Sequence, residues 1–378
     1  MDRKYLLKLA AKNFLFWLSR RIDYPLLPPD TVQVNFSFSC NLRCKMCQMH
    51  AQERSLKAQG RQVEIDSGTF RKIIAETRQL GVKSILFIGG EPLLRPDLFD
   101  LVADAKKAGL SPVVVTNGVL LGREAIGRCL ESGVDWLSIS IDAATEETFR
   151  RIRGENVLSR IKENIALLEK MKRDAGRPSP RLVCVCTVMD DNLEELSDVV
   201  DLCVSLGVER VMFQPVVPNN IDQTQRSGPA PGLLPPARLG VLSDALDKLI
   251  AYKRRSRGHY ARIANGIWQL DLMKKYFSGK MRPADMPCYA GYNRLQIVQE
   301  GRLYFCVNQE RFEANFGDVA RDSLQRLWFS GKARSYRRLI RRCAAPCLQW
   351  CSYRDGFIEL KDFFEKRRIF ERQEAHVF

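Results

Sequence analysis

The chain has 378 residues, of which 45% are hydrophobic and 28% are charged, and its net charge is +16. This composition excludes wholesale disorder, and the length predicts one large domain with a smaller appendage. The twelve cysteines do not indicate a secreted disulfide scaffold, because they are clustered in a long chain without a signal peptide. They predict metal ligation in a reducing cytoplasm. The basic charge suits nucleic acid, an anionic membrane surface or an anionic substrate, and it does not choose among them.

Residues 1–30 predict a basic amphipathic helix at the N-terminus. Lys4, Lys8 and Lys12 recur at helical spacing among leucine and aromatic side chains. Such a helix can lie in the interface of a bilayer, but charges interrupt every apolar run before it reaches the length of about 20 residues that a span requires. Two interpretations stay open: packing against the rest of the protein, and peripheral contact with the inner face of the membrane.

A strand predicted at 32–38 leads into three closely spaced cysteines, Cys40, Cys44 and Cys47. Thiolates this close together can bind one soft metal centre. A structural zinc site is closed by four protein ligands, whereas a [4Fe–4S] cluster has four irons, so three cysteines leave one iron open for a small molecule. A zinc clip or a chance grouping of cysteines is the alternative.

The CxxxCxxC spacing resembles the signature of the radical S-adenosylmethionine (radical SAM) enzymes. The resemblance implies that the open iron binds the amino and carboxylate groups of SAM, and that one electron cleaves SAM to a 5′-deoxyadenosyl radical. It also implies a reducing partner such as flavodoxin or ferredoxin. Met46 stands where many members have an aromatic residue against adenine, and methionine is a soft substitute for that residue.

A buried strand that begins at residue 84 breaks at Gly89 and Gly90, where the lack of side chains lets backbone approach a ligand closely. Together with Glu91 and Pro92, these glycines resemble the GGEP motif of the family, whose backbone and glutamate recognise the SAM amino group. A plain turn is the alternative.

Helices and strands alternate along residues 67–216, which predicts βαβ units, right-handed crossovers and a parallel sheet. Six strands are too few for a closed eight-stranded barrel, and they match the partial (β/α)6 barrel of the radical SAM family. The polar stretch at 48–66 predicts a loop around the cluster. The other elements are predicted as helices at 67–80, 97–108, 123–132, 160–173 and 193–206, and strands at 112–116, 136–142, 181–189 and 210–216.

Polar residues end the third and fourth predicted strands. Thr116 and Asn117 close the third, and Ser140 and Asp142 close the fourth. They resemble family positions that contact the ribose and methionine parts of SAM, and Arg153 resembles an arginine that pairs with the SAM carboxylate. The alternatives are an ordinary turn, a helix cap at Asp142 and a solvated arginine.

Three residues are candidates for catalysis or substrate contact. Cys184 and Cys186 share one face of the fifth strand, where a thiol near the radical can donate a hydrogen atom. Buried free cysteine usually behaves as a small hydrophobe, so a place in the core is the alternative. Gln214 ends the sixth strand and is a candidate for contact with substrate or for a hydrogen bond at the barrel rim.

A second group of cysteines lies in one C-terminal region. Residues 295–298 and 303–305 predict a hairpin that brings its first two members together. The region resembles the SPASM/Twitch extension, which binds auxiliary [4Fe–4S] clusters. A full SPASM domain needs more than five cysteines, so the resemblance implies one auxiliary cluster, as in the Twitch form, and structural zinc is the alternative. The five are Cys288, Cys306, Cys343, Cys347 and Cys351.

The predicted fold class is α/β, with a partial (β/α)6 TIM-type barrel followed by a small cysteine-rich α+β Twitch-like domain. The predicted units are the N-terminal helix (1–30), the barrel (31–216), a linker with helices (217–284), the Twitch-like domain (285–355) and a C-terminal helix (356–378).

We therefore expect a cytoplasmic radical SAM enzyme that abstracts a hydrogen atom from its substrate. The basic charge favours oxidation or another modification of a carbohydrate, lipid-linked or other anionic small substrate. A maturase of a ribosomally made peptide or protein is the alternative within the family. Outside it, the alternatives are an iron–sulfur electron carrier, which leaves the GGEP motif unexplained, and a zinc-stabilised nucleic-acid-binding protein. No nucleic-acid-binding motif supports the latter, so nucleic acid is not an expected partner.

Overall fold

The computed structural model describes residues 3–61, 64–217, 234–299, 301–306, 315–343, 347–349, 353 and 355–374. Within these residues, eight strands form one sheet in the order β6-β5-β4-β3-β2-β1-β7-β8. All neighbouring strands pair in parallel except β7 and β8, which are antiparallel. The strands are β1 (Thr31–Asn35), β2 (Ser84–Ile88), β3 (Ser111–Thr116), β4 (Trp136–Ser140), β5 (Arg181–Val188), β6 (Arg210–Pro215), β7 (Arg294–Val298) and β8 (Leu303–Tyr304).

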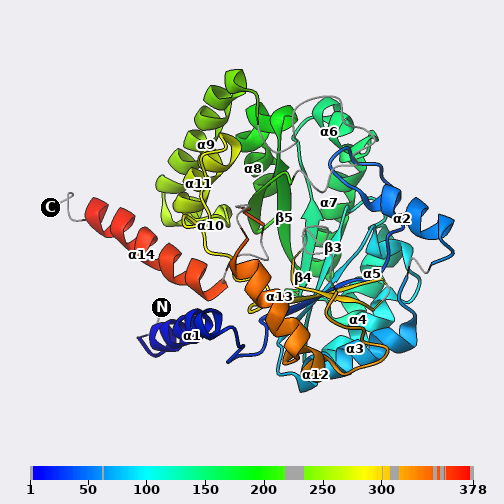
Figure 1. The fold of residues 1–378 in the computed structure, drawn as a ribbon. Helices are drawn as coiled ribbons and strands as arrows, with labels where there is room; N and C mark the ends of the chain where they lie inside the picture. The colour runs from blue at the N-terminus through cyan, green and yellow to red at the C-terminus, as the bar shows by residue number, and fades with distance from the viewer. Residues whose placement is uncertain are drawn as a thin grey trace.

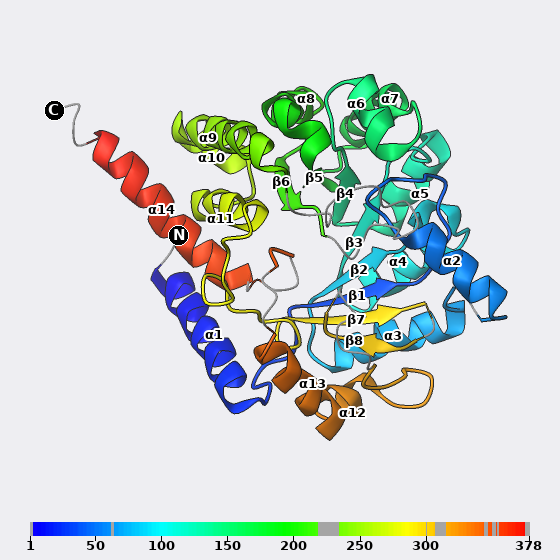
Figure 2. The same ribbon diagram turned by 45° about the horizontal axis from the view of Figure 1, so that its top comes forward.

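Helices surround the sheet (Figure 1). In Figure 2, α3 to α8 lie outside the parallel strands, α9 to α11 lie beside β6, and α12 and α13 lie beside β7 and β8. The helices are α1 (Arg3–Ile22), α2 (Met49–Ala58), α3 (Ser67–Gln79), α4 (Leu98–Lys107), α5 (Arg123–Ser132), α6 (Glu146–Arg153), α7 (Leu158–Asp174), α8 (Leu196–Ser205), α9 (Leu239–Arg254), α10 (Arg257–Arg262), α11 (Ile267–Phe277), α12 (Leu324–Trp328), α13 (Gly331–Arg341) and α14 (Asp355–Glu374). Short 3₁₀ helices are η1 (Pro92–Leu94), η2 (Asp190–Glu195) and η5 (Pro236–Arg238).

The two faces of the curled sheet differ in polarity. In β1, Val32 and Val34 are fully buried in the hydrophobic core, whereas Gln33 and Asn35 line a central cavity. Side chains point alternately to opposite faces of a strand, so one face packs against helices and the other faces the cavity. This arrangement confirms the predicted partial barrel.

The C-terminal hairpin extends the wall of the barrel. β7 pairs in parallel with β1, with Gln33 opposite Gln296 and Asn35 opposite Val298. β8 then returns antiparallel to β7. The sequence predicts this hairpin as part of a separate small domain, and it does not predict the pairing with β1. That pairing satisfies the backbone groups on the edge of β1 that a six-stranded sheet would leave open.

The predicted alternation of helices and strands is confirmed, with ends that differ by up to three residues. The predicted loop at 48–66 is wrong over α2, which spans Met49–Ala58. The sequence gives little sign of this helix because Leu56 is its only buried residue, so it lacks a periodic apolar face. The short helix α6 is also missed, because its two buried apolar residues, Phe149 and Ile152, give only a brief periodic signal among its many charges.

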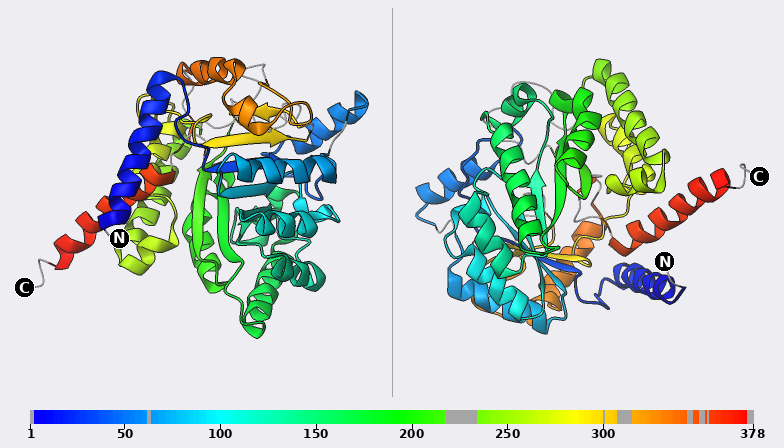
Figure 3. Two further views of the ribbon diagram at one scale, coloured as in Figure 1. Left: turned by 90° about the horizontal axis from the view of Figure 1, so that it is seen from below. Right: turned by 180° about the vertical axis from the view of Figure 1, so that it is seen from behind.

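The two terminal helices pack against each other at one side of the molecule (Figure 3). The Tyr5 hydroxyl in α1 donates to the Glu359 carboxylate in α14 at 2.7 Å. Among the described residues, no helix combines the length and apolar character needed to cross a bilayer.

A buried lysine joins the helices beside β6. Lys253 in α9 is fully buried, and its ammonium group donates to the carbonyls of Tyr260 and Ile263 at 2.9 and 2.8 Å. Burial lowers the pKa of Lys253 to about 8, and the carboxylates of Asp362 and Glu365 in α14 partly oppose this shift.

The lowered pKa predicts a pH-dependent contribution of Lys253 to stability. Between about pH 8 and about pH 10, the unfolded chain holds a proton on this residue that the folded chain has released. The free energy of unfolding of the wild type should therefore rise across this range relative to the Lys253→Met variant, by about 2 kcal/mol. Denaturant unfolding of both proteins at several pH values measures the difference. A difference that does not change with pH would contradict the assignment.

Candidate functional site

The cysteine triad, Cys40, Cys44 and Cys47, lies on the loop that follows β1. Within this loop the Cys47 N–H donates to the Cys44 carbonyl at 3.1 Å, and the Leu42 N–H donates to the Cys40 Sγ at 3.5 Å. Met46 and Cys47 line the cavity. Burial, with a smaller contribution from the neighbouring Cys44 thiol, raises the pKa of Cys40 to about 12 and of Cys47 to about 11. The three sulfurs thus share one electrostatic environment.

The glycine turn after β2 contacts the start of the triad loop through backbone. The Gly90 N–H donates to the Ser37 carbonyl at 2.7 Å, and the Glu91 N–H donates to the Ser39 carbonyl at 2.9 Å. A Cβ at Gly89 would lie 2.6 Å from the Ser37 oxygen, and one at Gly90 would lie 2.1 Å from the Ser39 oxygen. The sequence predicts that the missing side chains let a ligand approach the backbone. In the structure, the segment that leads into the triad takes up this close approach.

The Glu91 carboxylate binds the end of β3. One oxygen accepts from the Thr116 hydroxyl at 2.6 Å and the Leu93 N–H at 3.0 Å, and the other accepts from the Asn117 N–H at 2.8 Å. The Asn117 amide in turn donates to the Asn41 side chain in the triad loop at 2.8 Å. Burial raises the pKa of Glu91, and these hydrogen bonds oppose the shift. The side chains of Glu91, Thr116 and Asn117 thus form hydrogen bonds within the protein, and their contacts with SAM stay predictions.

Asp142 and Arg153 form a buried ion pair beside the triad. Asp142 is completely buried, and one of its carboxylate oxygens lies 2.5 Å from the Arg153 guanidinium. Its other oxygen accepts from the Thr187 N–H at 2.7 Å. The Asp142 carboxylate is thus enclosed by protein groups, and its predicted contact with SAM stays a prediction.

Arg153 links this ion pair to the triad. Its guanidinium also lies 3.5 Å from the Cys44 Sγ. Burial alone would lower the pKa of Arg153, but Asp142 and Cys44 raise it above its usual value, so the side chain stays charged. The predicted pairing of Arg153 with a SAM carboxylate has to compete with Asp142.

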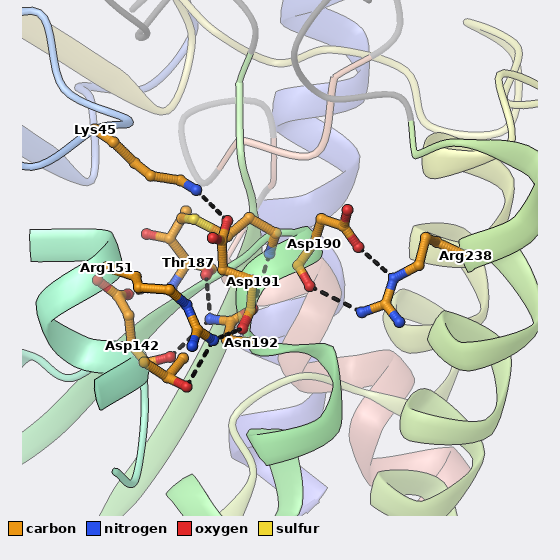
Figure 4. A network of polar contacts seen from close by, with 10 residues as sticks. Lys45, Asp142, Arg151, Thr187, Asp190, Asp191, Asn192 and Arg238 are labelled. Carbon is orange, nitrogen blue, oxygen red and sulfur yellow. Dashed lines mark hydrogen bonds and ion pairs between the residues drawn. The ribbon is translucent and has the colours of Figure 1, made fainter. Parts of the chain in front are cut away.

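The 3₁₀ helix η2 ties this region to the triad loop and to α9 (Figure 4). The Asn192 amide donates to the carbonyls of Asp142 and Thr187 at 2.7 and 2.9 Å. Lys45, inside the triad loop, pairs with Asp191. Sequence reasoning missed this network, although the acidic run directly after β5 is visible in the sequence.

A second ion pair anchors η2 from its other side. Arg238 contacts Asp190 at 2.5 Å and Glu194 at 2.7 Å. Because Arg238 directly precedes α9, the pair connects η2 to the helices beside β6.

The cavity has a volume of about 1180 Å³ and runs along the inner face of the strands. Eight amide side chains line it, compared with four arginines and two acidic residues. The predicted residues Met46, Ser140 and Gln214 lie on its wall. The amides are Gln33, Asn35, Gln48, Gln52, Gln214, Gln296, Gln299 and Gln349.

Four amide atoms on this wall are buried and have no hydrogen-bond partner within the described part of the chain. Each of these atoms has almost no accessible surface, so it lies inside the wall and does not face the open cavity. The atoms are Asn35 Oδ1, Gln48 Nε2, Gln296 Nε2 and Gln299 Oε1.

Cys184 and Cys186 do not reach the cavity. Both are completely buried in the hydrophobic core, and their neighbours Val183 and Val185 are the residues of β5 that line the cavity. Their thiols face the carbonyls of Ile141 and Asp142 at 3.6 and 3.8 Å. They therefore occupy the core, on the opposite face of the strand from the cavity, as the alternative interpretation of these residues states.

The C-terminal cysteines lie around the hairpin and α13. Cys288 precedes β7 and Cys306 follows β8, so both stand at the open end of the hairpin. Cys343 follows α13, and Cys347 lies a few residues further on. Cys351 is outside the described residues. Which of the five bind a cluster stays a prediction.

The number of thiols in the triad fits an iron–sulfur cluster better than structural zinc. A structural zinc site is closed by four protein ligands, whereas three cysteines on a cubane cluster each bind a different iron and leave the fourth iron open.

Two family profiles match the chain. Residues 34–218 match the radical SAM superfamily, and residues 288–352 match SPASM, an iron–sulfur cluster-binding domain. The chain belongs to the radical SAM superfamily. This radical SAM enzyme therefore uses SAM, a SAM-binding [4Fe–4S] cluster and an auxiliary cluster, which confirms the predicted cofactors.

Characterised relatives are distant but cover most of the chain. A tungsten-containing aldehyde ferredoxin oxidoreductase cofactor-modifying protein of Pyrococcus furiosus is 23% identical over 85% of this chain and 88% of its own length. A PqqA peptide cyclase of Methylocella silvestris is 26% identical over 85% of this chain and 80% of its own. A probable GTP 3′,8-cyclase of Saccharolobus solfataricus is 25% identical over 75% and 84%.

Solved structures share the fold. Streptococcus suis SuiB bound to precursor peptide SuiA gives a TM-score of 0.63 at 13% identity, covering 89% of this radical SAM enzyme and 72% of SuiB. The structure of anSMEcpe with bound AdoMet and the Cp18Cys peptide gives 0.62 at 16% identity, covering 93% and 99%.

The close approach of the glycine turn predicts a large effect of Gly90→Ala. The new Cβ would clash with the Ser39 carbonyl, which is backbone and cannot rotate away. We expect the free energy of unfolding to fall by at least about 2 kcal/mol, and the triad to retain less iron. The control is Gly127→Ala in α5, where nothing lies within 4 Å of the new Cβ. That substitution should stabilise the helix by about 0.5–1 kcal/mol. Equal effects of the two changes would contradict the clash.

The buried ion pair predicts non-additive effects. Asp142→Asn leaves the Arg153 charge without its carboxylate, which should cost about 3 kcal/mol of unfolding free energy. The double variant Asp142→Asn/Arg153→Met removes that buried charge and should lose less than the sum of the two single variants. Thermal unfolding of the four proteins tests the cycle, and strict additivity would show that the pair is not coupled.

Proposed function

We propose that this radical SAM enzyme modifies a peptide or protein segment that binds in the barrel cavity. The relatives include a peptide cyclase, and the solved neighbours include enzymes bound to peptides. These likenesses favour the peptide-modifying alternative over the carbohydrate, lipid-linked or anionic small substrate that the sequence predicts.

The observation that carries the proposal is the set of eight amide side chains that line the cavity. Each amide side chain offers both a hydrogen-bond donor and an acceptor. A peptide backbone offers N–H and C=O groups in alternation, so an extended segment can pair with both. An anionic group offers only acceptors, so it can pair with the amide N–H groups but not with the amide oxygens.

The chain positions such a segment next to its cofactors. Met46 and Cys47 line the same cavity as the amide side chains, so a bound segment lies beside the triad. Gln214, at the end of β6, supplies a further amide at this end of the barrel. When bound, SAM and the cluster supply the radical that removes a hydrogen atom from the substrate. The residues of the chain bind and orient the segment, and the glycine turn and the Asp142–Arg153 pair hold the triad loop.

The remaining assignments belong to the same proposal. Cys40, Cys44 and Cys47 hold the SAM-binding cluster, and ligands for the auxiliary cluster come from Cys288, Cys306, Cys343, Cys347 and Cys351. A flavodoxin or ferredoxin in the cytoplasm supplies the electron.

The experiment tests the substrate class by removing one class of candidate substrate at a time from a cell extract. The holoenzyme is reconstituted without oxygen and mixed with SAM, dithionite and the low-molecular-weight fraction of an extract from the organism that encodes the chain. 5′-Deoxyadenosine is measured above the background without extract. We expect stimulation by the extract to be lost after protease treatment and kept after phosphatase treatment or lipid extraction.

The controls separate chemistry from substrate class. The Cys40→Ala/Cys44→Ala/Cys47→Ala variant should form no 5′-deoxyadenosine with any fraction. Stimulation that survives protease but is lost after phosphatase would overturn the peptide proposal in favour of an anionic small substrate.

A further inference from the structure

The outer face of α1 carries a stripe of large apolar side chains. Leu7 is 64% exposed, Phe14 is 58% exposed and Trp17 is 43% exposed. Residues at i, i+7 and i+10 lie on one side of a helix. The rings of Phe14 and Trp17 stack with their centroids 5.7 Å apart, so the stripe is continuous at its centre.

The opposite face of α1 is buried against the protein, so the orientation of the helix is fixed. Leu9 and Phe16 are 7% and 2% exposed. A Cβ at Gly356 of α14 would lie 2.9 Å from Leu9, and the Arg20 guanidinium donates to the Cys288 carbonyl at 3.0 Å. These contacts turn the stripe away from the body, at the side of the molecule where the termini lie (Figure 3).

The exposed apolar surface is concentrated at this helix and the segment after it. Eleven large apolar side chains are exposed among the described residues, and seven of them lie between residues 5 and 26. Scattered exposed apolar residues need no explanation, but a contiguous group on one helix indicates a binding surface.

The charge of α1 identifies the kind of partner. Residues 3–22 contain six lysine and arginine residues and no acidic residue. Lys8 is exposed beside the stripe, and the Arg21 guanidinium lies 5.4 Å from the centre of the Trp17 ring. A second copy of the chain on this face would bring two such cationic helices together, which like-charge repulsion disfavours. An anionic lipid surface complements both the apolar stripe and the charge.

We propose that α1 docks the enzyme on an anionic bilayer surface. The helix lies in the plane of the interface, with Leu7, Phe14 and Trp17 among the lipid headgroups and Lys8 and Arg21 against the anionic lipids. The proposal is independent of the substrate class, because it rests on the outer face of α1 and not on the cavity.

The test is flotation of the full-length holoenzyme with lipid vesicles. One set contains phosphatidylcholine alone, and the other also contains phosphatidylglycerol. We expect binding to the anionic vesicles, weakened by added salt, and little binding to phosphatidylcholine alone. The Leu7→Ser/Phe14→Ser variant should bind the anionic vesicles at least about tenfold more weakly, because burial of either side chain contributes more than 1.4 kcal/mol.

A matched variant elsewhere on the surface controls for the loss of exposed apolar side chains. Leu339→Ser/Phe364→Ser removes one leucine and one phenylalanine that are 47% and 57% exposed, and it should bind vesicles like the wild type. Both variants should form 5′-deoxyadenosine at the wild-type background rate, which shows that they fold.

Three results would overturn the proposal. They are the absence of binding to anionic vesicles at low salt, an equal loss in both variants, and a wild-type dimer in light scattering that Leu7→Ser/Phe14→Ser dissociates without any effect on vesicle binding.

Discussion

Hydrogen bonds from the backbone of Gly90 and Glu91 to the chain just before Cys40 determine the geometry of the whole site. The triad loop has little regular structure of its own, so its position depends on what it rests on. The turn after β2 can come this close only without side chains at the glycine positions. The Glu91 carboxylate also binds the turn to the end of β3, because it accepts hydrogen bonds from the Thr116 hydroxyl and the Asn117 N–H. Three neighbouring strand ends are thereby joined into one support.

The other side of the triad loop is held by charge. The Arg153 guanidinium bridges the Asp142 carboxylate and the Cys44 sulfur, and Lys45 pairs with Asp191. Water is largely excluded from the Asp142–Arg153 pair, so it stabilises the fold only as a complete unit. Hydrogen bonds on one side and ion pairs on the other restrain the loop. Pre-organisation of this kind lowers the conformational cost of assembling a cluster site.

Much of the architecture could be predicted because the alternation of helices and strands is local. The positions of the cysteines, glycines and strand-end polar residues were also visible in the sequence. What could not be predicted depends on which residues face each other across the fold. In β5 both faces are apolar, so the sequence offers no contrast that would place Cys184 and Cys186 outside the cavity. The Glu91–Thr116 bond and the pairing of β7 with β1 join residues far apart in the chain, and no local pattern encodes them.

Because β7 pairs in parallel with β1, two distant parts of the chain together form the wall of the cavity. The N-terminal part supplies the triad loop and its supports, whereas the C-terminal part contributes Gln296 and Gln299 directly to the lining. Exchange of the C-terminal segment between relatives, as by recombination, would replace one wall of the cavity and leave the radical-generating end intact. Substrate selectivity and radical chemistry can thus evolve separately in one barrel. The two parts that determine them meet where β7 pairs with the edge of β1.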